Sequence, residues 1–157
     1  MEELTNIIQS DQDELMSSID EFQADILKTF LKNTSNDYLT SADNWLNATT
    51  ANTAKFGGEQ GKAKIYRDKL LEELEKFLCG AEQYEEDRKK IAESSDKSQQ
   101  YIIGVMSAAI GKTIGAAGTF IAPVIVLLIL SLGKMALNAW CEMRKETKKQ
   151  VTLPKKT

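Results

Sequence analysis

Histidine is absent from this 157-residue chain, and cysteine and proline occur only twice each. Without histidine, the commonest general base, the usual catalytic triads and most zinc sites are excluded. Cys79 and Cys141 are too few for a disulfide framework, so we expect ordinary cytosolic or buried thiols, with one bridge as the alternative. We therefore predict a protein that is not an enzyme, with no catalytic residues, no cofactor and no bound metal.

Alternating strand-like runs are also scarce, which makes helix the expected structure throughout. Apolar side chains recur every three or four positions over residues 2–32 and, less regularly, over residues 38–54, which predicts one helix over each range. The cap- and turn-forming residues 33–37 are expected to separate the two helices. A heptad-like apolar seam follows over residues 62–97 and predicts a long helix, in which Gly80 permits a local bend. We predict an all-α fold in which residues 1–100 form elongated amphipathic helices, packed as a bundle or a coiled-coil-like pair.

Charged residues fill the remaining faces of the third helical segment. Most charge runs of this kind form a solvated helix face, although a specific docking surface is the alternative. The residues assigned to this face are Glu72, Glu73, Glu75, Lys76, Glu85, Glu86, Asp87, Arg88, Lys89 and Lys90.

Acidic and basic residues are unevenly divided, although the net charge is only −3. Residues 1–100 hold 21 acidic and 12 basic side chains, whereas residues 101–157 hold 2 acidic and 8 basic side chains. A basic flank beside an apolar segment suits the head groups of an anionic bilayer. A solvated tail that aids solubility is the alternative. We expect no nucleic-acid partner.

The longest apolar segment covers residues 101–132, where the only charge is Lys112. The twenty uncharged residues 113–132 would span about 30 Å as a helix, close to the hydrocarbon thickness of a bilayer. The acidic N-terminus lacks the basic start and apolar core of a secretory signal. We predict a membrane-associated protein without a signal peptide, whose apolar segment is sheltered before it inserts.

Three topologies compete for this segment: a single span in either orientation, or a hairpin. A single span would either place the basic C-terminal flank on the far side of the membrane or require export of about 100 residues without a signal. A hairpin keeps both ends on one side, with arms at residues 101–114 and 120–132 and a turn at residues 115–119. Each arm is about 20 Å long, so the hairpin would be re-entrant, tilted or would thin the bilayer. The charge distribution slightly favours the hairpin.

Small side chains recur at four-residue spacing in the first half of this segment, a pattern that lets helix backbones approach closely in lipid. We predict that they pack helices within and between copies of the chain, and that Lys112 lines a pore or snorkels to the surface. Tight packing in a soluble core and a flexible apolar loop are the alternatives. The candidate insertion and packing residues are Gly104, Ala108, Gly111, Lys112, Gly115, Gly118 and Pro123.

Residues 133–157 are expected to form a basic amphipathic helix followed by a frayed tail. Tryptophan beside several cations is typical of the membrane–water boundary. The candidate anchoring residues are Lys134, Trp140, Arg144, Lys145, Lys148 and Lys149.

The order of these features resembles two groups of α-helical membrane-permeabilising proteins. The α-helical pore-forming toxins carry an apolar hairpin between long helices. In the apolipoprotein L family an acidic helix leads into a glycine- and alanine-rich stretch that closes on an Ala-Pro step. Here residues 72–96, residues 111–118 and the pair Ala122-Pro123 follow that second order. The resemblance covers about 60 residues and implies membrane insertion.

We therefore predict a membrane-active helical protein that inserts its apolar segment into an anionic bilayer and forms a homo-oligomer, with a pore as one form of that assembly. A second hypothesis is a membrane-anchored adaptor whose seam at residues 66–91 pairs with a helical protein partner. A third is a soluble bundle whose central hairpin never meets lipid.

Overall fold

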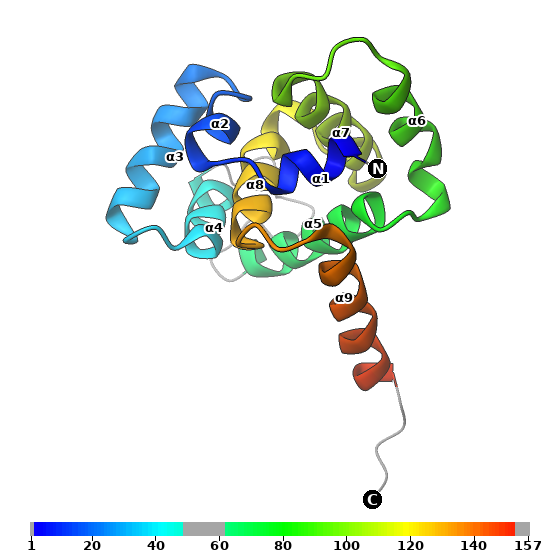
Figure 1. The fold of residues 1–157 in the computed structure, drawn as a ribbon. Coiled ribbons are helices and arrows are strands. Elements are labelled where there is room, and N and C mark those ends of the chain that lie inside the picture. Colours follow the sequence, from blue (N-terminus) through cyan, green and yellow to red (C-terminus); the bar gives the residue numbers. More distant parts are fainter. Residues whose placement is uncertain (1, 49–61, 153–157) are drawn as a thin grey trace, which may run out of the picture.

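The computed structural model describes residues 2–48 and 62–152, with side chains placed for residues 2–48 and 63–148, and all regular elements in these ranges are helices (Figure 1). The predicted all-α fold is confirmed. In chain order the elements are α1 (Glu2–Ile8), α2 (Gln12–Met16), α3 (Glu21–Asn33), α4 (Tyr38–Ala48), α5 (Lys62–Leu78), the 3-10 turn η2 (Glu82–Tyr84), α6 (Glu85–Glu93), α7 (Gln99–Ile114), α8 (Gly118–Ser131) and α9 (Leu137–Thr152).

The first periodic segment is three short helices, so the prediction of one long helix over residues 2–32 is wrong. Serine and glutamate side chains at the breaks bond to nearby backbone, which competes with helix continuation. The Ser10 hydroxyl donates to the Asn6 carbonyl at 2.9 Å, and the backbone N–H of Asp11 donates to the Glu14 carboxylate at 2.9 Å. The Ser17 hydroxyl donates to the Glu14 carbonyl at 2.7 Å.

The third segment is also divided, because α5 ends at Leu78. Gly80 has a φ of +92°, a left-handed conformation that closes the helix, and the Ala81 N–H donates to the Lys76 carbonyl at 2.9 Å. From α6, the Arg88 guanidinium donates to the Phe77 carbonyl at 3.0 Å and to the Ala81 carbonyl at 2.6 Å. A continuous heptad helix over residues 62–97 is therefore ruled out.

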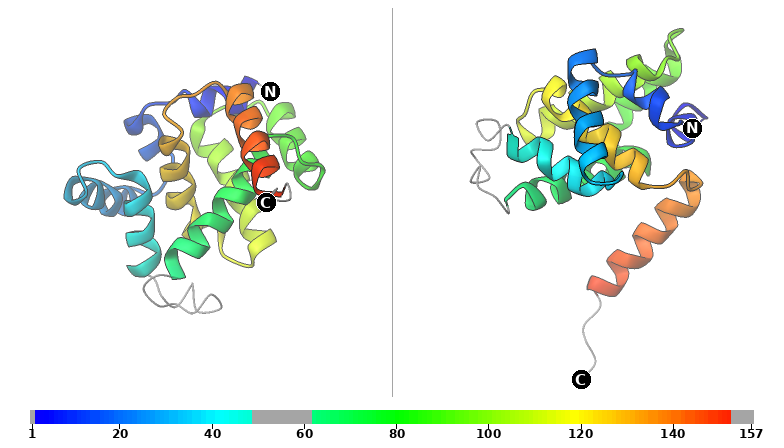
Figure 2. Two further views of the ribbon diagram at one scale, coloured as in Figure 1. Left: turned by 90° about the horizontal axis from the view of Figure 1, so that it is seen from below. Right: turned by 90° about the vertical axis from the view of Figure 1, so that its left-hand side faces the viewer.

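α8 lies at the centre of the fold, surrounded by helices from both halves of the chain (Figures 1 and 2). α4, α5 and α7 make the main contacts with it, and α1, α2 and α3 complete the cover. α5 packs on α4, α7, α8 and α9 and does not form the predicted coiled-coil-like pair with the first segment. α9 starts against α1 and α5 and then extends away from the body (Figures 1 and 2).

The predicted second helix and the turn before it are in place where the structure describes them. α4 covers residues 38–48, and residues 49–54 of the prediction lie outside the described residues. The turn at residues 33–37 contains Ser35 and Asn36 with φ values of 55° and 66°. Both residue types are common in turns, and asparagine in particular tolerates this left-handed backbone.

Candidate functional site

The apolar segment forms a sharp corner between α7 and α8. The Ser98 hydroxyl caps α7 by accepting from the Tyr101 N–H at 3.2 Å. At the other end Gly115 adopts a φ of +78°, and the N–H groups of Gly115 and Ala116 donate to the Gly111 carbonyl at 2.8 and 2.9 Å. The helix direction changes by 112° between α7 and α8. The break falls inside the turn predicted at residues 115–119.

Two glycines bring the backbones of this corner into direct contact. A Cβ atom on Gly111 would lie 2.5 Å from the Ala116 carbonyl oxygen, and one on Gly118 would lie 3.1 Å from the Ala108 Cα. Neither position accepts a larger side chain without a backbone shift. Gly104 differs, because a Cβ there would meet nothing within 4 Å. In this fold Gly111 and Gly118 therefore pack helices within one chain. Gly118 approaches the backbone of Ala108, whose side chain lies with Gly104 on the exposed face of α7.

α8 is buried around its whole circumference. Every residue from 120 to 129 is buried, including Pro123, and the helix carries no charge. A helix that is apolar on all sides needs a nonaqueous environment on all sides, whether a protein core or a bilayer. Among the described residues, the core of this chain provides that environment.

The first turn of α8 is held by side chains from two other helices. Pro123 has no N–H to donate to the Thr119 carbonyl four residues earlier. Gln23 of α3 donates to that carbonyl through Nε2 at 2.8 Å. Trp45 of α4 donates through Nε1 to the neighbouring Phe120 carbonyl at 2.9 Å. α3 and α4 thus cover α8 and also satisfy its backbone near the proline.

α7 has one buried face and one exposed face. Gly104, Ala108, Lys112 and Thr113 are on the exposed face. Above Gly104 and Ala108 is a groove of about 460 Å³, which Ile19 and Gln23 border from the other side. The Lys112 side chain lies in the last turn of α7, where a cation is favourable to the helix dipole.

Within residues 2–48 and 62–152, no single helix is both long and apolar enough to cross a bilayer. α7 and α8 taken together meet the requirement on length and composition, with the 112° bend between them.

The predicted anchoring residues are spread over different contacts. Trp140 is 3% exposed, packed in the core rather than at a surface. The Lys134 ammonium pairs with Asp11, and Lys145 lies 3.8 Å from Glu142. Lys149 lies in α9, but its side chain is outside the described part of the chain.

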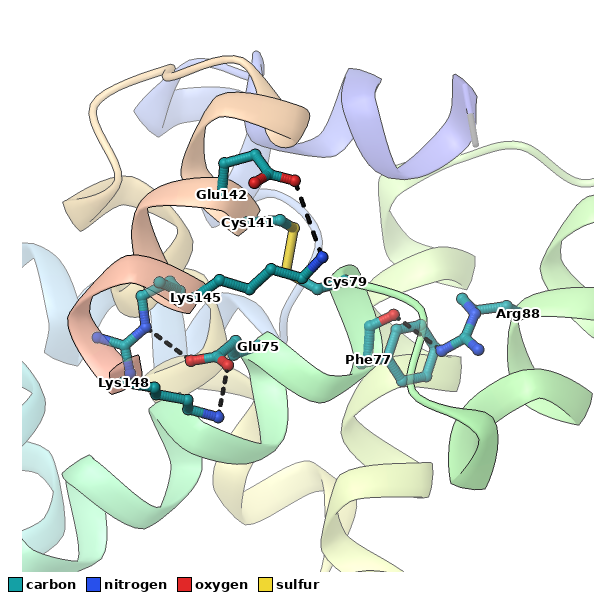
Figure 3. Close-up of a disulfide and its surroundings, with 9 residues drawn as sticks. Glu75, Phe77, Cys79, Arg88, Cys141, Glu142, Lys145 and Lys148 are labelled. Carbon is teal, nitrogen blue, oxygen red and sulfur yellow. Dashed lines mark hydrogen bonds and ion pairs between the residues drawn. A yellow bond between two sulfur atoms is a disulfide. The ribbon is translucent and has the colours of Figure 1, made fainter. Parts of the chain in front are cut away.

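The remaining two anchoring candidates converge on one buried carboxylate. Arg144 Nε and Lys148 Nζ each lie 2.7 Å from the carboxylate of Glu75, which is buried on α5 (Figure 3). Burial raises the pKa of Glu75, but the hydrogen bonds from Lys148 and Arg144 outweigh it, and the net pKa is lowered. These two cations attach α9 to the body.

Glu73 forms a second buried polar centre, which sequence reasoning placed on the solvated face. The Glu73 side chain is 1% exposed and accepts hydrogen bonds from Tyr84 at 2.7 Å and Lys76 at 3.0 Å. The Tyr84 hydroxyl also lies 2.9 Å from the Thr113 hydroxyl of α7. Burial and the Glu73 carboxylate raise the pKa of Tyr84 to about 12. The solvated-face assignment is therefore wrong for Glu73 and Glu75.

No known protein family, curated protein or solved structure matches this chain. Among the described residues, no group of three histidine, cysteine, aspartate or glutamate side chains is arranged to hold a metal ion. The most distinctive assembly is the charge-free α8 with its amphipathic cover, joined to α7 through a corner of small residues.

Proposed function

We propose that this protein is membrane-active: its amphipathic helices shelter α8 in the folded form and separate from it at a bilayer, where α7 and α8 insert. The observation that carries the proposal is the burial of residues 120–129 on every side of a helix without charge. Such a helix exchanges protein contacts for lipid contacts at little cost, because lipid chains are as apolar as the core.

The cover has the properties that such an exchange requires. α3 turns Ala24, Leu27 and Leu31 towards the core and keeps charged residues outside, so its apolar face can lie on a membrane surface once it leaves α8. α7 brings an exposed, uncharged patch at Gly104 and Ala108, one helical turn apart. In the inserted form these two residues would allow close contact between copies of the chain, which supports a homo-oligomer.

The adaptor hypothesis receives less support. Its proposed partner surface was the seam in residues 66–91, but the seam residues are buried inside this chain. Tyr66, Leu70, Leu74, Phe77 and Ile91 are each 0% exposed. A partner coiled coil would have to displace the core of the protein to reach them.

Gly104 offers a direct test of insertion, because the site is exposed and open. Gly104→Glu has room in the folded form and replaces a poor helix former, so the fold is kept. In a bilayer the carboxylate costs about 2.5–3.5 kcal/mol at the centre of an inserted helix. We expect wild type and Gly104→Ala to release dye equally from phosphatidylglycerol-rich vesicles, and Gly104→Glu to release it less by more than about tenfold.

Circular dichroism and thermal unfolding of both variants show that the comparison is between folded proteins. Vesicle flotation separates binding from permeabilisation. Equal release by Gly104→Glu and wild type would exclude insertion of α7. Failure of the wild type to bind or permeabilise vesicles at high protein-to-lipid ratio, at neutral and at acidic pH, would refute the proposed function.

A further inference from the structure

The Cys79–Cys141 disulfide joins the end of α5 to the first turns of α9 (Figure 3). This is the bridge that the sequence left as an alternative, and it accounts for both cysteines of the chain. Cys79 is exposed and Cys141 is half-buried, so the bond is not enclosed in the core. Structural disulfides of small domains are often shielded, whereas accessible ones undergo exchange.

A cavity of about 640 Å³ lies directly at the bridge and is lined by both cysteines. Four cations and two carboxylates border it, so the formal charge around the sulfurs is positive. Figure 3 shows the Lys145 side chain passing beside the disulfide. The charged residues that line the cavity are Lys76, Arg88, Lys145, Lys148, Glu75 and Glu142.

We propose that this disulfide is a thiol–disulfide exchange site for a dithiol or a small anionic thiol, and that its reduction releases α9 from the body. The cavity gives the thiol room to approach, and the cations attract a thiolate and stabilise the thiolate that leaves.

The more exposed sulfur defines the order of the steps. An incoming thiolate attacks Cys79 Sγ, the S–S bond breaks, and its electron pair leaves with Cys141 Sγ. That thiolate is one helical turn from Lys145 on α9. A second thiolate then attacks the external sulfur of the mixed disulfide and displaces Cys79. Two thiols supply two electrons and two protons, and they leave as one disulfide.

Release follows from how little else holds α9. Leu137 and Trp140 pack into the core at its start, and Glu75 binds Arg144 and Lys148 further along. Beyond these contacts α9 extends away from the body (Figure 1). Once the covalent link is removed, α9 is held by these two apolar side chains and by the two ion pairs to Glu75, whose cations are partly exposed.

The first experiment measures accessibility and release together. Native protein is treated with dithiothreitol, thiols are trapped with iodoacetamide, and helicity is followed by circular dichroism. Trp45→Phe leaves Trp140 as the only tryptophan, and Trp140→Phe leaves Trp45 as the matched control. We expect complete reduction of the disulfide while the helices are retained. The fluorescence emission of Trp140 should shift to the red and be quenched more strongly by iodide, whereas the emission of Trp45 should not change.

The double variant Cys79→Ser/Cys141→Ser should expose Trp140 in the same way without reductant. Reduction that occurs only under unfolding conditions would overturn the exchange site. A Trp140 that stays protected in the reduced protein and in the double variant would overturn the release of α9.

The role of the cations has its own control. Lys145 is exposed at the cavity, whereas Lys28 is exposed on α3, which lies on the other side of the body (Figure 1). Lys145→Gln should slow reduction by glutathione about two- to fivefold at low salt, as expected for loss of one nearby charge. Lys28→Gln should leave the rate unchanged. Equal rates in all three proteins would exclude the electrostatic contribution.

Discussion

Individual glycines in α7 have opposite roles although they share one helix. Gly104 faces open space, so a methyl group there adds helix propensity without contact. Gly111 faces the backbone of residue 116, so the same methyl group has no room. The two sites allow the effect of packing to be separated from the effect of propensity.

Gly104→Ala and Gly111→Ala should therefore change stability in opposite directions. We expect the first to raise the free energy of unfolding by up to about 1 kcal/mol. The second should lower it by about 1–3 kcal/mol, because the Ala116 carbonyl must move. Urea titrations followed by circular dichroism measure both. Equal effects of the two substitutions would show that the corner of α7 and α8 is not as close as described.

Two buried carboxylates on α5 make the fold sensitive to acid. Burial raises the pKa of Glu73, but hydrogen bonds from Tyr84 and Lys76 outweigh it and bring the net pKa below the ordinary 4.5. Glu75 behaves in the same way with Lys148 and Arg144. A carboxyl whose pKa is lower in the folded state stabilises the fold above its unfolded pKa, and this contribution is lost as the pH falls through its folded pKa.

The melting temperature should therefore be nearly constant from about pH 7 to pH 5 and fall below about pH 4.5. Glu73→Gln and Glu75→Gln should each lower the melting temperature at neutral pH and make its decrease at acidic pH shallower. Glu86→Gln, at an exposed position on α6, serves as the control and should keep the wild-type profile. Scanning calorimetry across this range tests the assignment, and an unchanged acid decrease in both buried-site variants would contradict it.

Among the helices, α9 depends most on a covalent link. The disulfide spans a sequence separation of 62 residues, so it restricts a long loop of the unfolded chain. In the loop-entropy description such a bridge contributes about 4 kcal/mol. The core around α8 does not need the bond to be built, because α9 is not among the helices that make the main contacts with α8.

The Cys79→Ser/Cys141→Ser variant should consequently melt roughly 10 °C lower than the oxidised wild type. Addition of a reductant should lower the melting temperature of the wild type to that of the variant and leave the melting temperature of the variant unchanged. Calorimetry of four samples, each protein with and without reductant, makes the comparison. A wild-type melting temperature that does not respond to reductant would show that the bridge adds no stability.

The molecule as a whole is organised around α8, and local stability should follow that arrangement. Backbone amides in the centre of α8 lie beneath several helices and open only when the cover opens. Residues 142–148 of α9 are mostly exposed and have few buried contacts. Stability within one protein ranges from almost zero at such ends to the global value in the core.

Hydrogen exchange measured by mass spectrometry should thus show the slowest exchange in residues 124–129 and fast exchange in residues 142–148. Intermediate rates are expected in α3, which covers α8 from one side only. If α8 exchanged as fast as α9, its burial in the folded form would be refuted, and with it the shelter on which the proposed function rests.

Several features of this fold could be predicted from the sequence because they depend on near neighbours. The spacing of apolar residues predicted helices, and the ends of α7 and α8 fall within a few residues of the expected arms. The breaks after residues 8 and 16 were missed, whereas at the break after residue 78 the sequence indicated only a local bend at Gly80. The first two breaks arise where Ser10 and Ser17 bond to backbone carbonyls three or four residues earlier. The third arises from the left-handed Gly80 and from the Arg88 guanidinium of α6.

The sequence by itself determined that the chain is helical and that residues 113–132 carry no charge. These properties follow from residue types and from contacts within one or two helical turns. Only the tertiary structure decided that α8 is enclosed, that Gly111 and Gly118 pack within one chain, that Glu73 and Glu75 are buried, and that Cys79 meets Cys141. Burial and pairing depend on segments far apart in the chain, and no local pattern specifies which of them meet.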